Sequence, residues 1–197
     1  MDPATLSAYD RQAAAFADDW LAQPAPDDMY ALLARHFTPG PTADVGCGAG
    51  RDVAWLASHG FDAIGYDASS ALLQEARRRH PQLRFEQSAL PGLPGIGSAR
   101  FQNVLCETVI MHLDPPQIGP AVRRLLQILR AGGHLYLSWR VTAGTAQRDR
   151  HRRLYSAFDA SLVLDECAGH EILMDAEEVS ASSGKTVHRV IVRKTNA

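Results

Sequence analysis

Three glycines stand at alternate positions in one short stretch, at Gly46, Gly48 and Gly50. Glycine has no Cβ and adopts positive φ without strain, so this spacing lets the backbone turn sharply and bring its N–H groups close to a bound molecule. The apolar run 42–45 before the glycines is typical of a short strand, and residues 52–57 after them have helical spacing. The stretch therefore predicts a strand, a ligand-binding glycine loop and a helix.

An aspartate closes the next apolar run, residues 61–67, which reads as a second strand ending at Asp67. In an open parallel sheet, ligands bind outside the carboxyl ends of the strands, where a carboxylate can accept hydrogen bonds from both hydroxyls of a ribose. The glycine loop and Asp67 together predict a ligand that contains a nucleoside. A dinucleotide loop needs its third glycine at position 51, and the chain has Arg51 there, which opposes a nicotinamide dinucleotide.

The stretch from Asp44 to Gly50, together with Asp67, resembles the first motif of the class I S-adenosylmethionine-dependent methyltransferases. In that Rossmann-like family an acid and an apolar residue precede G-C-G-x-G, and a second acid closes the next strand. The resemblance covers the chain from Tyr9 to the C-terminal strands. It implies S-adenosylmethionine as cofactor, S-adenosylhomocysteine as product, no metal ion, and methyl transfer to O, N, S or a heavier chalcogen of a small-molecule acceptor.

The same resemblance predicts which residues bind the cofactor, mainly at the carboxyl ends of the first four strands. They are Tyr9, Asp44, Gly46, Cys47, Gly48, Gly50, Arg51, Asp67, Ala68, Ser88, Ala89, Leu90, Cys106 and Glu107. Ala89 departs from the family pattern, because many members have an aspartate there that binds the adenine amino group. Contact with adenine would then fall to Ser88 or to the backbone at Ala89 and Leu90.

On the acceptor side, His112 follows the fourth strand and Trp139 closes the fifth. In the family these two strand ends flank the sulfonium, so both residues are expected near the transferred methyl, with Phe16, Trp20 and Arg140 contacting the acceptor. The alternative is that His112 is a hydrogen-bonded structural histidine and Trp139 a core residue. Methyl transfer from a sulfonium mainly requires alignment, so the family needs no universal base.

Composition restricts the class of protein. The 197 residues, 46% hydrophobic and 21% charged, suit one globular domain, and the formal net charge of −2 opposes general affinity for nucleic acid. The three cysteines contain no C-x-x-C pair, which fits neither a disulfide framework nor zinc and favours a reducing cytoplasm. No apolar run approaches the ~20 residues of a membrane span. We expect a soluble cytoplasmic monomer or homodimer whose partner is a small molecule, with no nucleic acid and no membrane.

Alternating strand and helix patterns predict an α/β fold, a doubly wound three-layer sandwich with a mostly parallel seven-stranded sheet and one antiparallel strand near the C-terminal edge. Residues 1–197 are expected to form a single domain. Within it we expect a helical lid at 1–38 containing one amphipathic helix over 6–21, a cofactor-binding core at 39–139, a variable insert and helix at 140–169 with helical spacing over 154–162, and a β-hairpin at 170–197.

Two other functions remain open at this stage. One is a protein that binds S-adenosylmethionine without catalysis and acts as a sensor or partner, since nothing in the sequence opposes it. The other is a nicotinamide-dependent oxidoreductase, which Arg51 disfavours. Turnover with any methyl acceptor would exclude the first.

Overall fold

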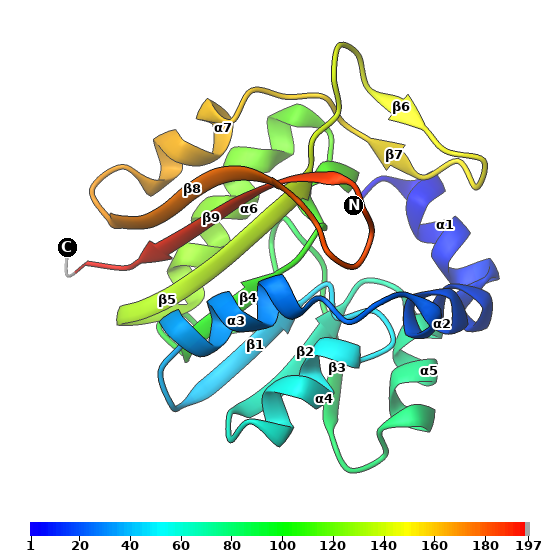
Figure 1. Ribbon diagram of the computed structural model, residues 1–197, viewed down its shortest axis with the longest axis horizontal. Coiled ribbons are helices and arrows are strands. Elements are labelled where there is room, and N and C mark those ends of the chain that lie inside the picture. Colours follow the sequence, from blue (N-terminus) through cyan, green and yellow to red (C-terminus); the bar gives the residue numbers. More distant parts are fainter. Residues whose placement is uncertain (196–197) are drawn as a thin grey trace.

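The computed structural model describes residues 1–195, and its centre is a seven-stranded sheet (Figure 1). The strand order is β3-β2-β1-β4-β5-β9-β8. The strands are β1 (Pro41–Val45), β2 (Asp62–Asp67), β3 (Arg84–Gln87), β4 (Phe101–Cys106), β5 (Leu129–Arg140), β8 (Glu171–Val179) and β9 (Thr186–Arg193). Strands β1 to β5 are parallel, whereas β9 runs antiparallel to both β5 and β8. The predicted fold class is confirmed.

Helices cover both faces of this sheet and make it the middle of three layers. On one face lie α3 (Asp27–His36), α4 (Arg51–Ser58) and α5 (Ser70–Arg79), and on the other lie α6 (Pro115–Ile128) and α7 (Ser161–Leu164). Leu33, Val53 and Leu73 belong to the apolar core under the first group, and Val122 and Leu125 to the core under the second. Figure 1 shows α3 and α6 on opposite sides of the strands.

The strand order reverses beside β1, and this reversal positions the site. From β1 the chain passes to β2 on one side and later returns to β4 on the other. Loops that leave neighbouring strands in opposite directions open a crevice at the carboxyl ends of the sheet. The glycine loop follows β1 at this point, and Asp67 is the last residue of β2.

The predicted helix over residues 6–21 is instead two helices, α1 (Pro3–Arg11) and α2 (Ala13–Ala22). Gln12 ends α1 with φ of −129°, outside the helical range. The break lets Tyr9 of α1 and Phe16 of α2 meet edge to face, with ring centres 5.2 Å apart. Helical periodicity does not predict this bend, because periodicity does not encode the tertiary contact between the two aromatic rings.

The helix expected over residues 154–162 was also wrong. Leu154–Tyr155 form β7, which pairs with β6 (Gln147–Arg148), and helix appears only at Ser161–Leu164. Distant partners hold this segment extended: the Leu154 N–H donates to Thr5 Oγ1 at 2.8 Å, and the Ser156 N–H donates to the Met111 carbonyl at 2.9 Å. Two short 3₁₀ turns, η1 (Ile110–His112) and η2 (Asp165–Cys167), complete the described elements.

Within residues 1–195, no helix is long and apolar enough to cross a membrane. The same residues contain no group of three or more His, Cys, Asp and Glu side chains that could hold a metal ion. Cys47, Cys106 and Cys167 are buried and unpaired.

Candidate active site

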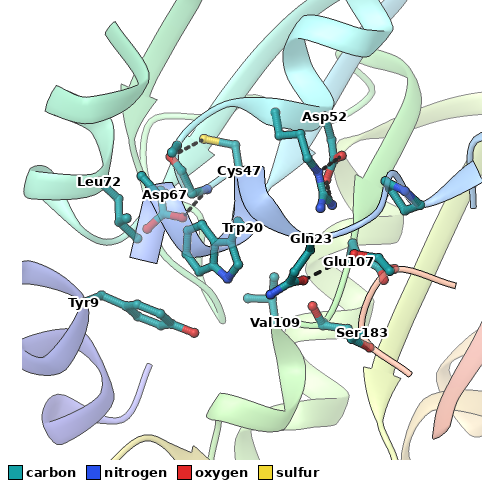
Figure 2. A pocket seen from close by; sticks show the side chains of 18 of the residues that line it. Tyr9, Trp20, Gln23, Cys47, Asp52, Asp67, Leu72, Glu107, Val109 and Ser183 are labelled. Atoms are coloured by element: carbon teal, nitrogen blue, oxygen red, sulfur yellow. Dashed lines mark hydrogen bonds and ion pairs between the residues drawn. The ribbon is translucent and has the colours of Figure 1, made fainter. Parts of the chain in front are cut away.

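A cavity of about 470 Å³ opens at the carboxyl ends of the central strands. The glycine loop and the end of β2 form one wall, and the ends of β4 and β5 form another. Residues of α1, α2, the segment after β6 and the turn between β8 and β9 complete the lining. Figure 2 shows Tyr9 and Asp67 on one side of this space and Glu107 and Ser183 on the other, with Trp20 between them.

The glycine loop is held in a conformation that only glycine adopts readily. Gly46, Gly48 and Gly50 have φ of 85°, 52° and 86°. The N–H groups of Gly46 and Cys47 both donate to the Tyr66 carbonyl, at 2.7 and 3.0 Å, which fixes the loop to the end of β2. A Cβ on Gly46 would lie 2.2 Å from a methyl carbon of Val109, so no larger residue fits there without displacement.

Asp67 faces the cavity and also supports the loop. Its Oδ2 accepts the Gly48 N–H at 2.9 Å and its Oδ1 accepts the Ser69 N–H at 2.8 Å. Burial raises the pKa of Asp67, although these two N–H groups act in the opposite direction. Each carboxylate oxygen keeps a second lone pair, so Asp67 can still accept hydrogen bonds from a bound diol.

An aromatic cluster, defined as Tyr9, Phe16 and Trp20, lies on the side of α1 and α2, where Tyr9 and Trp20 line the cavity and Phe16 packs against both. The ring centre of Trp20 lies 5.9 Å from the ring centre of Phe16, in a stacked arrangement, and 6.0 Å from the ring centre of Tyr9. The indole of Trp20 rests on the glycine loop, because a Cβ built on Gly48 would lie 2.9 Å from its ring. This places an apolar ring beside the loop and opposite the strand ends.

His112 is buried at the foot of the cavity between two hydrogen-bond partners. Its Nδ1 lies 2.5 Å from the Leu154 carbonyl and its Nε2 lies 3.0 Å from Tyr9 Oη. A carbonyl only accepts, so Nδ1 carries the proton and Nε2 accepts from the tyrosine hydroxyl. Burial lowers the pKa of His112 to about 4, which keeps the imidazole neutral at physiological pH.

The far wall of the cavity carries acidic side chains that already have partners. Glu107, which follows β4, accepts a hydrogen bond from the hydroxyl of Ser138 in β5, and burial raises the pKa of Glu107. Asp52 at the start of α4 forms an ion pair with Arg51, with Nε and Oδ1 2.8 Å apart. Both acids lie beside the glycine loop, on the side away from Asp67 (Figure 2).

Ten of the predicted site residues line this one cavity, from five separate parts of the chain. They are Tyr9, Trp20, Gly46, Cys47, Gly48, Arg51, Asp67, Glu107, His112 and Arg140. The others do not line it: Phe16, Asp44, Gly50, Ala68, Ser88, Ala89, Leu90, Cys106 and Trp139.

Two of the residues outside the lining need a physical account. Trp139 is 3% exposed and stacks on His188, with ring centres 4.3 Å apart, so its side chain is part of the core rather than the cavity wall. Asp44 is 2% exposed, its Oδ2 has no hydrogen-bond partner, and burial raises the pKa of its carboxyl group. Asp44 therefore lies under the glycine loop and not on the cavity surface.

The wall residues that were not anticipated from the sequence include Arg153, Tyr155 and Lys185. Arg153 and Tyr155 belong to the insert, where the basic run 150–153 followed by Tyr155 was the available signal. Lys185 ends the turn between β8 and β9, and an antiparallel pairing of β9 with β5 returns this turn to the carboxyl end of the sheet. The position of that turn could have been inferred from the predicted hairpin.

The residues present fit S-adenosylmethionine. The cavity volume of about 470 Å³ lies within the range of small-molecule sites. Asp67 offers acceptor oxygens for a ribose diol, and Gly46 and Gly48 line the cavity at positions where an added Cβ would collide with Val109 or Trp20. Leu72 and Trp20 supply apolar surface near Asp67 (Figure 2). When bound, this cofactor supplies an electrophilic methyl group on a sulfonium.

Comparison with known proteins also points to methyltransferases. Residues 43–133, from β1 into β5, match the family model of the methyltransferase domain. The chain is 28% identical over 125 residues to a ubiquinone biosynthesis O-methyltransferase of Alkalilimnicola ehrlichii, covering 61% of this chain and 47% of the relative. It is 36% identical over 101 residues to a trans-aconitate 2-methyltransferase of Rhodopseudomonas palustris, covering 49% and 37%. The chain thus spans less than half the length of these curated relatives.

Among solved structures, the fold is similar to a 1,6-didemethyltoxoflavin-N1-methyltransferase of Burkholderia thailandensis with bound S-adenosylhomocysteine. The TM-score is 0.76 at 24% identity, covering 98% of this chain and 88% of that one. Residues 43–133 thus form a methyltransferase domain by their match to the family model, and the glycine loop, the acid that closes β2 and the strand order are those of the class I S-adenosylmethionine-dependent methyltransferase fold.

Proposed function

We propose that the chain transfers a methyl group from S-adenosylmethionine to a heteroatom of a small-molecule acceptor. One observation carries this proposal: the glycine loop and Asp67 share a single cavity with a second set of polar and aromatic side chains, Tyr9, His112 and Tyr155. A protein that only held the cofactor would need the first set alone. The second set provides room and chemistry for another molecule beside it.

In this proposal Asp67 accepts hydrogen bonds from the ribose hydroxyls, and the glycine loop lets the backbone approach the nucleoside. Tyr9, His112 and Tyr155 form the acceptor side, opposite the loop. His112 positions the Tyr9 hydroxyl through the 3.0 Å hydrogen bond from Oη to Nε2. Alignment of acceptor and methyl in a closed cavity can lower the barrier by about 7 to 11 kcal/mol, which makes positioning the main task of these residues.

The relatives favour small acceptors without fixing the atom. Their names describe an O-methyltransferase of ubiquinone biosynthesis, a methyltransferase of trans-aconitate and an N-methyltransferase of didemethyltoxoflavin. We extend from these only the class of a small organic molecule. Three buried thiols without disulfides are consistent with a reducing compartment, so we also propose action in the cytoplasm.

The test is transfer of labelled methyl to panels of phenols, amines, thiols and carboxylic acids, with calorimetry of S-adenosylhomocysteine in parallel. We expect binding of the product and transfer to at least one class of acceptor. Binding without transfer to any class would favour the alternative of a non-catalytic cofactor-binding protein. NADH is the negative control, and tight NADH binding would contradict the assignment.

A further inference from the structure

We propose that the acceptor is a small organic acid, held by Arg140 and Lys185 and methylated on a carboxylate oxygen. This inference rests on the proposed methyl transfer and adds the chemical class of its substrate. Three observations on the cavity carry it: the pairing of its charged groups, the geometry of its two cations at the end of β5, and the state of its one buried histidine.

Most charged groups in the cavity wall already have a partner. Arg51 pairs with Asp52 at 2.8 Å, Arg79 with Asp18 at 2.6 Å, and Arg153 with Asp149 at 2.7 Å. The remaining two acids are also hydrogen-bonded, Asp67 to backbone N–H groups and Glu107 to the hydroxyl of Ser138. The wall therefore holds few charges that are free to bind a ligand.

Arg140 and Lys185 are the exceptions among the side chains, and the N-terminal ammonium of Met1, which also lines the cavity, donates to the Leu90 carbonyl at 3.2 Å. Within residues 1–195, neither side chain forms an ion pair with a carboxylate, and both line the cavity. Arg140 is half-buried, and its guanidinium carbon lies 4.9 Å from the centre of the Tyr155 ring, so the fork rests on an aromatic face. A half-buried guanidinium without a counter-charge favours an anion, and its planar fork matches a carboxylate.

The sheet brings these two cations together. Arg140 ends β5 opposite Val187 of β9, and the Val141 N–H donates to the Thr186 carbonyl at 3.0 Å. Lys185 is the exposed turn residue directly before β9, so the pairing of β9 with β5 places this turn beside the end of β5. Both residues line the same cavity, and both side chains are long and flexible enough to approach one anion there.

The state of His112 favours a nucleophile that has no proton to lose. Its Nδ1 donates to the Leu154 carbonyl and its Nε2 accepts from Tyr9, so neither nitrogen is free for the acceptor. A carboxylate is already deprotonated at neutral pH, whereas a phenol or an amine needs a base. One carboxylate oxygen forms the bond to the methyl carbon while the carbon–sulfur bond breaks and its electron pair stays on sulfur. The ester and the thioether carry no charge at these atoms, and no proton is released.

The test uses matched pairs of acids and amides, such as cinnamate with cinnamamide and benzoate with benzamide, beside phenols, amines and thiols. We expect labelled methyl to enter acids and not their amides, without proton release in a weakly buffered indicator assay. In the presence of S-adenosylhomocysteine, calorimetry should show that the acid which serves as substrate binds and that its amide does not.

Substitutions of Arg140 and Lys185 test whether these two residues bind the acid. Arg140→Met should raise KM for the acid at least about 10-fold, since a charge-assisted bidentate contact is lost, and Arg140→Lys should restore part of it. Lys185→Met should raise KM less, and both should leave the Kd of S-adenosylhomocysteine within about threefold. Arg150→Met is the matched control, because Arg150 is an exposed arginine of the same insert outside the cavity wall, and it should change neither constant.

The outcomes separate the two proposals. Transfer only to phenols, amines or thiols would overturn the organic-acid inference and leave methyl transfer standing. Binding of S-adenosylhomocysteine with no transfer to any compound would overturn both. If Arg140→Met instead weakened S-adenosylhomocysteine binding and left KM for the acid unchanged, Arg140 would hold the cofactor's own carboxylate, and the inference would be wrong.

Discussion

Tyr9 Oη lies 3.0 Å from Nε2 of His112 and donates its proton to that nitrogen. The direction follows from the other ring nitrogen, which donates to the Leu154 carbonyl at 2.5 Å. This one imidazole thereby joins α1, η1 and β7, three segments that are far apart in the sequence. It also makes the neutral histidine part of how the N-terminal helices are attached to the site.

Stability should depend on pH through His112. Burial lowers its pKa to about 4 in the folded chain, against about 6.5 when unfolded, so the unfolded chain takes up a proton first as pH falls. The stabilisation is present above pH ~6.5 and is lost as pH falls toward ~4. From pH 7.5 to 5.0 this amounts to about 2 kcal/mol. Urea unfolding of wild type and His112→Gln at both pH values should show that the variant lacks this component; equal pH dependence would contradict it.

Turnover should be flat through pH 6.5. An imidazole with a pKa of about 4 stays neutral from pH 6 to 8, so its protonation cannot change the rate in that range. The measurement is kcat and kcat/KM against pH for wild type and His112→Gln, with the Kd of S-adenosylhomocysteine at each pH. A rise through pH 6.5 that disappears in the variant would instead show that His112 titrates normally and acts as a base.

Replacement of Asp67 by Asn should weaken S-adenosylhomocysteine binding by about 10-fold or more. The amide keeps one acceptor oxygen, but its NH₂ group faces one of the two N–H donors, from Gly48 or Ser69, that the carboxylate now accepts. Hydrogen bonds to a charged acceptor contribute about 1.5 to 3 kcal/mol each. Asp62→Asn, at the exposed start of the same strand, is the control. Equal affinities of the two variants by calorimetry would remove Asp67 from the site.

Replacement of Gly48 by Ala should reduce S-adenosylhomocysteine affinity more than replacement of Gly60 by Ala. Both glycines have positive φ, 52° and 85°, so both variants share a backbone penalty of about 1 kcal/mol. Only at Gly48 does the new methyl group meet a neighbour, the Trp20 ring at 2.9 Å, while nothing lies within 4 Å at Gly60. The Tm should fall in both variants, and further in Gly48→Ala, because the Trp20 ring must also shift there. Calorimetry that found unchanged affinity for Gly48→Ala would mean that the ligand does not approach this loop.

The part of the site that sequence could predict is the part made by local motifs. Gly46, Gly48 and Asp67 lie within one strand-loop-helix-strand unit, where glycine spacing and strand ends fix the geometry over a short distance. The same holds for the fold class, because alternating strand and helix patterns and the final hairpin can be read from local stretches of the sequence. These features depend on contacts between neighbouring segments.

The part that sequence could not predict depends on contacts between distant segments. Trp139 alternates with Arg140 along β5, and in the structure Trp139 packs in the core against His188 whereas Arg140 lines the cavity. Tyr155 reaches the cavity because Thr5 holds the neighbouring Leu154 in an extended conformation. A pairing across such a separation leaves no periodic signal in either segment.

The chain contains three tryptophans, and Trp20 is the one whose fluorescence should respond to a ligand in the cavity. Trp55 is stacked on Tyr30 and His59, and Trp139 on His188, while Trp20 is the one that lines the cavity within residues 1–195. Any molecule that reaches Gly48 must change the surroundings of this indole. Intrinsic fluorescence should therefore report occupancy of the cavity without a label, and Trp20→Phe should silence that signal while the emission of the other two tryptophans remains.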